Sequence, residues 1–259
     1  MEKRKDVIVS IREKGQKLYL VGLEVRHEVG AIANLANILE KGRFSIVSGF
    51  VSSPGEDGYG RCSFFVQATE GRPSAAALAK MLEGSKYARA VEVAEAHKGL
   101  ITDGMNFPLA WNSGDRGIML RTHFFSVMEE GIRDILGTGG DVLLYQLGYH
   151  HGAPTWRDLL SGYHVEDAED LQVALGYYNA TGWGRPEVVS FDLEGKKSAV
   201  EIWDNFECLS KPAKLPAGSN FFRGHLAGMF ESVYNARVKV VETKCVSTGS
   251  DRCEFAVTA

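Results

Sequence analysis

The sequence lacks the features that define several large protein classes. It has no run of about 18 uncharged apolar residues, so no membrane-spanning helix is predicted. Four cysteines in 259 residues are too few for a fold built on disulfides. No Gly-x-Gly-x-x-Gly follows a predicted strand, and no P-loop, Gly-x-Ser-x-Gly or His-Glu-x-x-His motif occurs. The common nicotinamide, nucleotide-hydrolysing, serine-hydrolase and zinc-protease chemistries are therefore not indicated.

The composition that remains is that of a globular protein. Hydrophobic residues make up 44% of the chain and charged residues 24%. Residues 1–100 carry 15 Lys and Arg against 12 Asp and Glu, whereas residues 101–259 carry 14 against 21. The acidic larger part argues against nucleic acid as a direct partner. At about 100–200 residues per domain, the length predicts two domains.

The first hundred residues predict a β-α-β-β-α-β order. Apolar, β-branched stretches indicate strands, and Ile32, Leu35 and Leu39 recur on one helical face. The expected elements are strands at 18–25, 44–51, 62–68 and 90–94, and helices at 31–40 and 73–82. This order is typical of the ferredoxin-like fold, in which two helices cover one face of four antiparallel strands.

The turn after the first strand, Arg26-His27-Glu28-Val29-Gly30-Ala31-Ile32, resembles that of the ACT regulatory domain. The resemblance covers residues 15–98 and implies that Gly30 helps to bind an effector. No Pro precedes Gly30, unlike the usual family segment, and Gly30 could simply permit the turn. The predicted sheet has one face without helices and two edges, so we expect a homodimer.

Residues 99–109 combine Gly and Pro without a clear period and are predicted to be a linker. Residues 110–259 are expected to form a second, mixed α/β domain. Its first helix, within 116–136, carries Phe124, Phe125, Met128, Ile132 and Ile135 at helical spacing. The later elements are expected as helices beginning at Asp141 and within 159–175, strands at 187–193 and 198–203, a helix at 221–234, and a final hairpin of 237–246 and 252–257.

The C-terminal motif is specific. Gly224-His225-Leu226-Ala227-Gly228 precedes Glu242-x-x-Cys245, a turn at Gly249 and Cys253-x-Phe255. This pattern strongly resembles the vinyl-4-reductase domain, a small-molecule-binding module related in fold to TRAPP transport subunits. The resemblance covers residues 110–259. That family includes sensor domains of aromatic-responsive transcription activators and a protein tied to bacteriochlorophyll synthesis. The two helical glycines favour close packing of another backbone over a binding role.

The two C-terminal cysteines suggest a metal site. Cys245 and Cys253 lie symmetrically about Gly249, so a hairpin can make them cross-strand neighbours with Cβ atoms about 4.5–5.5 Å apart. Thiolates at that spacing suit tetrahedral zinc, and Glu242 could supply an oxygen ligand. Glu242 and Cys245 reach the same side only if a bulge or strand end separates them. Two free thiols, or a disulfide, are the alternatives.

The resemblance adds detail to this site. The aromatic-responsive sensors bind zinc through the residues that match Glu242, Cys245 and Cys253. Their fourth ligand is a Cys five residues before Gly-x3-Gly, and this chain has Ser219 there. Cys208 could replace it if the loop from Lys211 to Gly218 folds back. We therefore expect a zinc site that is structural rather than catalytic.

Aromatic residues are dense in the same region and could line an apolar ligand pocket, although packing in the core is the alternative. The ligand-binding candidates are Tyr178, Trp183, Trp203, Phe206 and Phe221. His150 and His151 look like a metal pair, but adjacent residues diverge on a helix, so a solvated helix end is the simpler interpretation. Cys62 is expected to be packed in its strand.

Together these features predict a protein that senses a small apolar or aromatic molecule. A reductase of a vinyl group on a tetrapyrrole-like substrate is one alternative, although no redox-cofactor motif was found. An assembly or trafficking adaptor is another, by fold analogy alone. A downstream protein partner or self-association would carry the output. The charged first six residues are not followed by a long apolar run, so a cytoplasmic location is expected.

Overall fold

The computed structural model describes residues 6–7, 9–12, 17–69, 71, 73–111, 115–209 and 218–259. The chain divides into two compact units, Met1–Ile118 and Met119–Ala259, and each is described by itself. In the described part of the chain, no helix has the length and apolar character needed to cross a bilayer. The first five residues, which contribute to the charged start of the sequence, lie outside the described residues.

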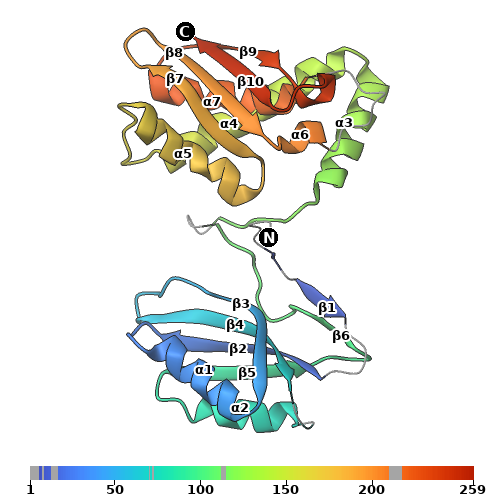
Figure 1. Cartoon of the computed structure of the whole chain (residues 1–259), viewed down its shortest axis with the longest axis vertical. Helices are drawn as coiled ribbons and strands as arrows, with labels where there is room; N and C mark the ends of the chain where they lie inside the picture. The colour runs from blue at the N-terminus through green and yellow to red at the C-terminus, as the bar shows by residue number, and fades with distance from the viewer. Residues whose placement is uncertain are drawn as a thin grey trace. The chain divides into compact units, whose positions relative to one another are not determined.

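The N-terminal unit has the predicted β-α-β-β-α-β order (Figure 1). Its elements are β2 (Leu18–Arg26), α1 (Ala31–Lys41), β3 (Phe44–Val51), β4 (Tyr59–Ala68), α2 (Ala75–Glu83) and β5 (Ala88–Glu95). The strands are antiparallel in the order β3-β4-β2-β5, which confirms the ferredoxin-like prediction. Leu35 and Leu78 of the two helices pack in one core with Val21 and Cys62 of the sheet. Cys62 is therefore a packed core residue, as expected.

Residues 99–109, where the sequence suggested a linker, contain a short strand. β6 (Leu100–Thr102) pairs antiparallel with β1 (Ser10–Arg12). Ile101 is buried against Leu18, Leu20 and Phe65, in a cluster separate from the core that the helices form. The Asn106 side chain extends this packing, because its amide donates to Ser63 Oγ at 3.0 Å. Part of the sheet is thus covered by the chain's own residues.

Gly30 has a conformational reason to be glycine. It precedes α1 with φ at +87°, in the left-handed region that side chains with a Cβ rarely adopt. A Cβ placed there would meet nothing within 4 Å. The turn therefore needs glycine for its backbone and not for close packing.

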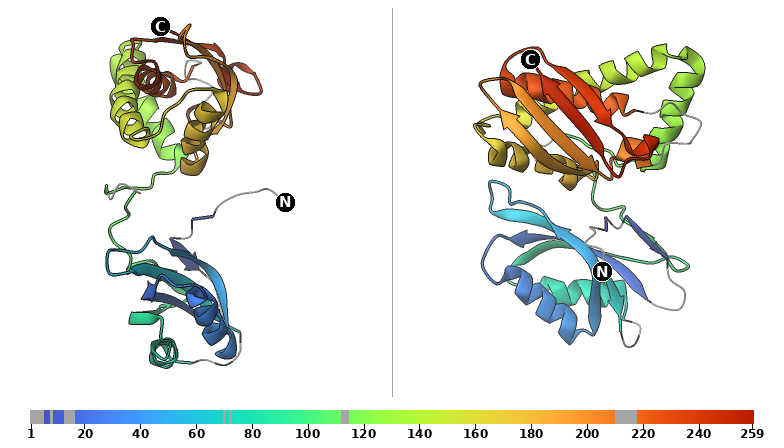
Figure 2. Two further views of the ribbon diagram at one scale, coloured as in Figure 1. Left: turned by 90° about the vertical axis from the view of Figure 1, so that its left-hand side faces the viewer. Right: turned by 45° about the horizontal axis from the view of Figure 1, so that its top comes forward.

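The C-terminal unit combines a second four-stranded antiparallel sheet with helices (Figures 1 and 2). Its helices are α3 (Thr122–Leu136), α4 (Gly139–Leu159), α5 (Ala168–Thr181), α6 (Phe206–Leu209) and α7 (Asn220–Tyr234). Its strands, in the order β7-β8-β10-β9, are β7 (Arg185–Asp192), β8 (Lys197–Trp203), β9 (Lys239–Lys244) and β10 (Cys253–Thr258). Phe222 and Leu226 of α7 pack in one core with Val200 and Phe255 of the sheet. The α+β class predicted for the chain is confirmed.

Helix α4 (Gly139–Leu159) begins two residues earlier than the sequence predicted. It starts at Gly139, preceded by Thr138, so Asp141 is not its N-cap. The Asp141 carboxylate instead accepts hydrogen bonds from Arg133 Nε at 2.7 Å and Asn220 Nδ2 at 3.0 Å. Pro154 lies inside α4, although proline usually marks a helix boundary. The extensive packing of α4 against α7 outweighs the local preference.

Four glycines let α4 and α7 cross closely. A Cβ on Gly224 would collide with the carbonyl oxygen of Tyr145 in α4, and one on Gly228 would collide with the backbone of Ala153. The relation is reciprocal, because Cβ atoms on Gly148 and Gly152 of α4 would collide with the backbone of α7. The close-packing interpretation of Gly224 and Gly228 is therefore confirmed.

The side of α3 that faces the core differs from the side that its apolar residues predict. Of the predicted stripe, Phe125 packs against the core, but Phe124 is 53% exposed and Ile135 is 82% exposed. The side that α3 buries carries Ser126, Glu129 and Arg133 instead.

An ion pair explains this orientation of α3. Arg133 donates to Glu129 at 2.5 Å and to Asp141 of α4 at 2.7 Å. Turning the helix around would separate Arg133 from Asp141 of α4, so this contact between the two helices holds α3 in its orientation.

Candidate ligand and metal sites

Four of the predicted ligand-binding residues meet in one aromatic cluster between α5, α6 and α7. The Trp183 ring lies at the centre, 5.0 Å from Phe206, 5.8 Å from Phe221 and 5.9 Å from Tyr178 between ring centroids. Tyr178 is fully buried, whereas Trp183 is only half-buried at the edge. The structure thus brings Tyr178, Trp183, Phe206 and Phe221 together.

Two other predicted residues lie elsewhere. Trp203, at the end of β8, packs its ring against the Arg252 guanidinium, 5.1 Å away, and lines a shallow surface groove with Arg185 and Glu187. Gly30 belongs to the N-terminal unit. The density of aromatic residues in the sequence could not show that Trp203 lies outside the cluster, because its position depends on where strand β8 ends.

His225 is a feature that sequence reasoning missed, although it stands inside the Gly224–Gly228 motif. Its side chain is completely buried. Nδ1 lies 2.9 Å from the Tyr178 hydroxyl and 3.4 Å from Nε1 of Trp156. Burial first, and the neighbouring His151 second, lower the pKa of His225 to about 3, so the ring is neutral near pH 7.

The hydrogen bonds of His225 define its protonation. An indole N–H can only donate, so Nδ1 accepts, and the proton of the neutral ring is on Nε2. Among the described residues, Nε2 has no hydrogen-bond partner and is buried. The His225 ring is surrounded by aromatic rings, with the centroids of Trp183 at 4.8 Å and His151 at 5.0 Å. An unsatisfied buried donor of this kind costs about 1–3 kcal/mol.

His150 and His151 lie within α4 rather than at its end. Both residues are exposed, but the two side chains diverge, as expected for adjacent helical positions. The His151 ring stacks on Trp183 at 5.8 Å, and this packing lowers its pKa by desolvation. His151 therefore belongs to the exposed edge of the aromatic cluster, and the pair does not form a metal site.

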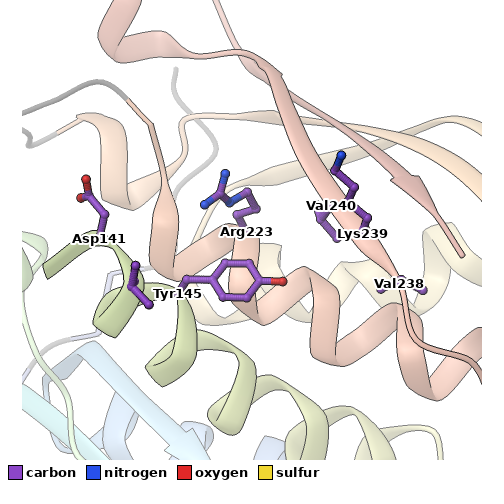
Figure 3. Close-up of a pocket in the computed structure, with 7 residues that line it drawn as sticks. Asp141, Tyr145, Arg223, Val238, Lys239 and Val240 are labelled. Atoms are coloured by element: carbon purple, nitrogen blue, oxygen red, sulfur yellow. The ribbon is translucent and has the colours of Figure 1, made fainter. Parts of the chain in front are cut away.

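A separate surface groove lies between α4, α7 and β9 (Figure 3). Its lining includes Tyr145, Arg223 and Lys239, and the Arg223 guanidinium lies 5.2 Å from the centre of the Tyr145 ring. None of the predicted ligand-binding residues lines this groove.

The predicted metal residues converge on one buried point. One donor atom each from Cys208, Glu242, Cys245 and Cys253 lies within 4.8 Å of all the others. Cys208 Sγ is 3.5 Å from Cys245 Sγ and 3.6 Å from Cys253 Sγ. Thiolates bound to one tetrahedral zinc at about 2.3 Å would be about 3.8 Å apart. The four cysteines of the chain are free, so no disulfide forms here.

Local structure explains how Glu242 and Cys245 reach the same buried point. β9 ends at Lys244, so Cys245 lies beyond the strand, and the pairing of β9 with β10 shifts register between Glu254 and Phe255. The strand end and bulge that the spacing required are therefore present. Because Glu254 pairs with Lys244, the next positions toward the turn are Cys253 and Cys245.

Ser219 holds Glu242 from the N-terminal end of α7. Its backbone N–H donates to Glu242 Oε2 at 2.7 Å, and its hydroxyl donates to Oε1 at 2.9 Å. Cys208, from α6, completes the donor set instead. This arrangement was expected to depend on the loop from Lys211 to Gly218. Residues 210–217 lie outside the described residues.

The contacts within the cluster shift the pKa values of its cysteines and of Glu242. Hydrogen bonds with Cys245 and Cys253, together with burial, raise the pKa of Cys208. Hydrogen bonds from Cys208 and Cys253 lower the pKa of Cys245. Burial raises the pKa of Glu242 to about 7. These contacts favour the thiolate form at Cys245 more than at Cys208, and a bound divalent cation would favour the thiolate form at every cysteine that it contacts.

Comparison with known families finds a similarity in this region. Residues 199–259, which carry Glu242, Cys245 and Cys253, match the family model of the V4R domain. Residues 199–259 of the C-terminal unit are therefore similar to the V4R domain. The vinyl-4-reductase resemblance seen in the sequence is therefore confirmed, and the match does not extend to the N-terminal unit.

Three proteins are similar to this chain in sequence or in structure. An uncharacterized protein of Methanocaldococcus jannaschii, MJ1642, is 25% identical over 126 residues, which are 49% of this chain and 69% of that protein. The phenol-responsive sensory domain of the transcription activator PoxR, solved with phenol, is 17% identical, with a TM-score of 0.50 over 57% of this chain and 79% of that domain. A vinyl-4-reductase family protein from M. jannaschii is 20% identical, with a TM-score of 0.38 over 55% of this chain and 83% of that one. The PoxR comparison supports a common fold for the C-terminal unit.

Proposed function

We propose that the C-terminal unit binds a small aromatic molecule in the cluster around Trp183 and His225, and that the protein acts as a ligand sensor. The observation that carries this proposal is the buried Nε2–H of His225, which has no partner among the described residues. Ligand sites combine apolar walls with a few placed polar groups, and this cluster has that composition. The phenol-responsive domain of PoxR, which shares the fold, supports the same class of ligand.

The protonation of His225 specifies the ligand further. Nε2–H is a donor, so the complementary ligand carries a hydrogen-bond acceptor, such as a phenolic, carbonyl or ether oxygen, on an aromatic ring. The half-buried Trp183 and the exposed His151 lie on the route that such a ligand would take from solvent. Cations are disfavoured because binding one would desolvate its charge beside a neutral imidazole.

The ligand is tested with two probes of similar size, phenol and toluene, by calorimetry on the full chain. We expect phenol to bind more tightly by at least about tenfold, because only phenol offers an oxygen to His225. Trp183→Ala should abolish binding, and Trp203→Ala, outside the cluster, should leave it unchanged. Failure of both probes and of other aromatic oxygen compounds to bind would contradict the proposal.

We also propose that Cys208, Glu242, Cys245 and Cys253 bind one structural zinc ion. The donor set of three buried thiols and a carboxylate suits tetrahedral zinc, and no position is left open for substrate. These residues would tie α6 and the β9–β10 turn to the start of α7 through Ser219. Because α7 also carries His225, the metal would fix one wall of the ligand site without touching the ligand.

Elemental analysis of protein purified without added metal tests the zinc site. We expect one zinc per chain, and Cys245→Ser should release it and lower the melting temperature, since structural zinc binding is coupled to folding. Cys208→Ser should behave alike, Glu242→Gln should weaken zinc less, and Cys62→Ser, in the other unit, should retain it. Well under one zinc per chain, with the thiols freely titratable, would rule the site out.

A further inference from the structure

The groove between α4, α7 and β9 combines cationic side chains with apolar walls. Its volume is about 380 Å³, within the range of sites that hold small organic molecules. Arg223 of α7 and Lys239 of β9 supply the positive charges, and Figure 3 shows the charged ends of both pointing to the same side. The apolar surface is supplied by Val142, Tyr145, Val238 and Val240. The groove therefore has the composition of a site for an anion with an apolar part.

The Arg223 guanidinium has no acidic partner among the described residues. Its Nη2 donates to the Asn220 side-chain oxygen at 2.9 Å, and its central carbon lies 5.2 Å from the centre of the Tyr145 ring. Its Nε is buried and has no hydrogen-bond partner in the described part of the chain. Arg133, by contrast, pairs with two carboxylates. Because a guanidinium does not lose its proton, Arg223 keeps a charge that the fold leaves unbalanced.

The carboxylate in the lining is bonded to other side chains. Asp141 accepts hydrogen bonds from Arg133 Nε of α3 at 2.7 Å and from Asn220 Nδ2 at 3.0 Å. Arg133 divides its charge between Asp141 and Glu129. The described lining thus holds two positive charges and one negative charge, and the negative one is paired with α3 rather than with Arg223.

The charged groups beside Tyr149 add one charge of each sign. Glu231 accepts a hydrogen bond from the Tyr149 hydroxyl at 2.6 Å, and this bond raises the pKa of Tyr149, whereas the charge of Arg237 lowers it. One positive charge therefore remains in excess around the groove. That excess suits a monoanion, and a guanidinium binds the two oxygens of a carboxylate through parallel hydrogen bonds.

We propose that this groove binds a small monocarboxylate with an apolar body. The Arg223 guanidinium and the Lys239 ammonium bind the carboxylate, and the hydrocarbon part lies on the valine side chains and the Tyr145 ring. Because α4, α7 and β9 all line the groove, the bound molecule joins three elements that are distant in the sequence. The proposal depends neither on the aromatic ligand nor on the metal.

Hexanoate and its neutral counterpart hexanamide test the site in an NMR titration of the full chain. Both probes are aliphatic, so they differ from the aromatic ligands proposed for the other site. We expect a millimolar or lower dissociation constant for hexanoate, as about eight non-hydrogen atoms allow, and at least about tenfold weaker binding of hexanamide. Amide shifts should centre on Lys239 and Val240, and inorganic phosphate should bind more weakly than hexanoate. Comparable binding of hexanamide, tighter binding of phosphate, or no hexanoate binding at about 10 mM would overturn the proposal.

Substitutions separate this groove from the aromatic cluster. Arg223→Gln should weaken hexanoate binding about tenfold, because it removes a charge-assisted contact. Lys239→Gln, at an exposed position where the fold is not at risk, should weaken it about threefold. Arg157→Gln, at an exposed position of α4, is the matched control, and both it and Trp183→Ala should leave the affinity unchanged. Hexanoate binding that is unaffected by Lys239→Gln and Arg223→Gln, or that is lost in Trp183→Ala, would overturn the assignment to this groove.

Discussion

The two units of this chain bury different kinds of side chain. Among the described residues of the N-terminal unit, the buried polar ones are Ser63 and Ser85. In the described part of the C-terminal unit, the buried polar or charged residues are Ser126, Glu129, Arg133, Ser198, Asn205, Glu207, Ser219 and His225, in addition to three cysteines. Charged and polar groups are costly to bury, so proteins retain them in a core where they serve packing geometry, metal binding or ligand binding. The contrast is in keeping with the ligand and metal sites that we propose in the C-terminal unit.

The largest effect expected from this contrast is at the helix crossing of the C-terminal unit. Gly224→Ala would drive a Cβ into the Tyr145 carbonyl and separate α4 from α7, so we expect it to lower the free energy of unfolding by more than about 4 kcal/mol. Urea unfolding followed by tryptophan fluorescence measures it. Gly176→Ala in α5, where a Cβ meets nothing within 4 Å, is the control and should stabilise the helix by up to about 1 kcal/mol. Equal effects of the two variants would contradict the close-crossing argument.

A second comparison sets a buried ion pair against an exposed one. Arg133→Met leaves the fully buried Glu129 without its guanidinium partner, so we expect a loss of about 3–5 kcal/mol in the free energy of unfolding. Arg89→Met in the N-terminal unit breaks ion pairs with Glu24 and Asp57 that lie in solvent, and should leave the unfolding midpoint unchanged within error. Similar losses in the two variants would remove the distinction between the units.

The third expectation is a pH dependence that arises from His225. Its folded-state pKa, about 3, lies below the ordinary value of 6.5, so the unfolded chain binds the proton first. Stability should therefore fall as pH decreases from 6.5 toward 3, by up to roughly 4 kcal/mol from this group. His225→Gln should flatten that part of the stability profile, measured by urea unfolding at each pH. His150→Gln, at an exposed position of α4, should leave the profile as it is, and an unchanged slope in His225→Gln would contradict the assignment.

The smallest effect is expected in the N-terminal unit. Gly30→Ala forces a residue with a Cβ into a left-handed conformation, but no atom stands in its way, so the cost should be about 1 kcal/mol of unfolding free energy. Gly30→Asn should cost less, because asparagine tolerates this region better. Zinc content and phenol affinity should stay the same in both variants. A change in either would link Gly30 to the C-terminal site.

Much of the fold and part of the site could be predicted from local patterns. The alternation of apolar residues and the turn residues predicted the β-α-β-β-α-β order, and the symmetric spacing about Gly249 predicted that Cys245 and Cys253 would approach. The start of α4 was predicted two residues late, because Asp141 resembles an N-cap but its carboxylate in fact accepts hydrogen bonds from Arg133 and Asn220. The run of α4 through Pro154 could not be predicted from local preference either, because it depends on the packing of α4 against α7.

The sequence by itself determined the features that depend on neighbours along the chain: the strand and helix order of the first unit, the motif that resembles the V4R domain and the hairpin that carries two of the candidate metal donors. The tertiary structure alone decided which distant groups meet. It placed Cys208 rather than Ser219 in the donor set, buried His225 among aromatic rings, set Trp203 apart from them and turned the apolar side of α3 to solvent. The physical reason is that periodicity and turn geometry act over a few residues, whereas burial depends on how whole helices and sheets pack.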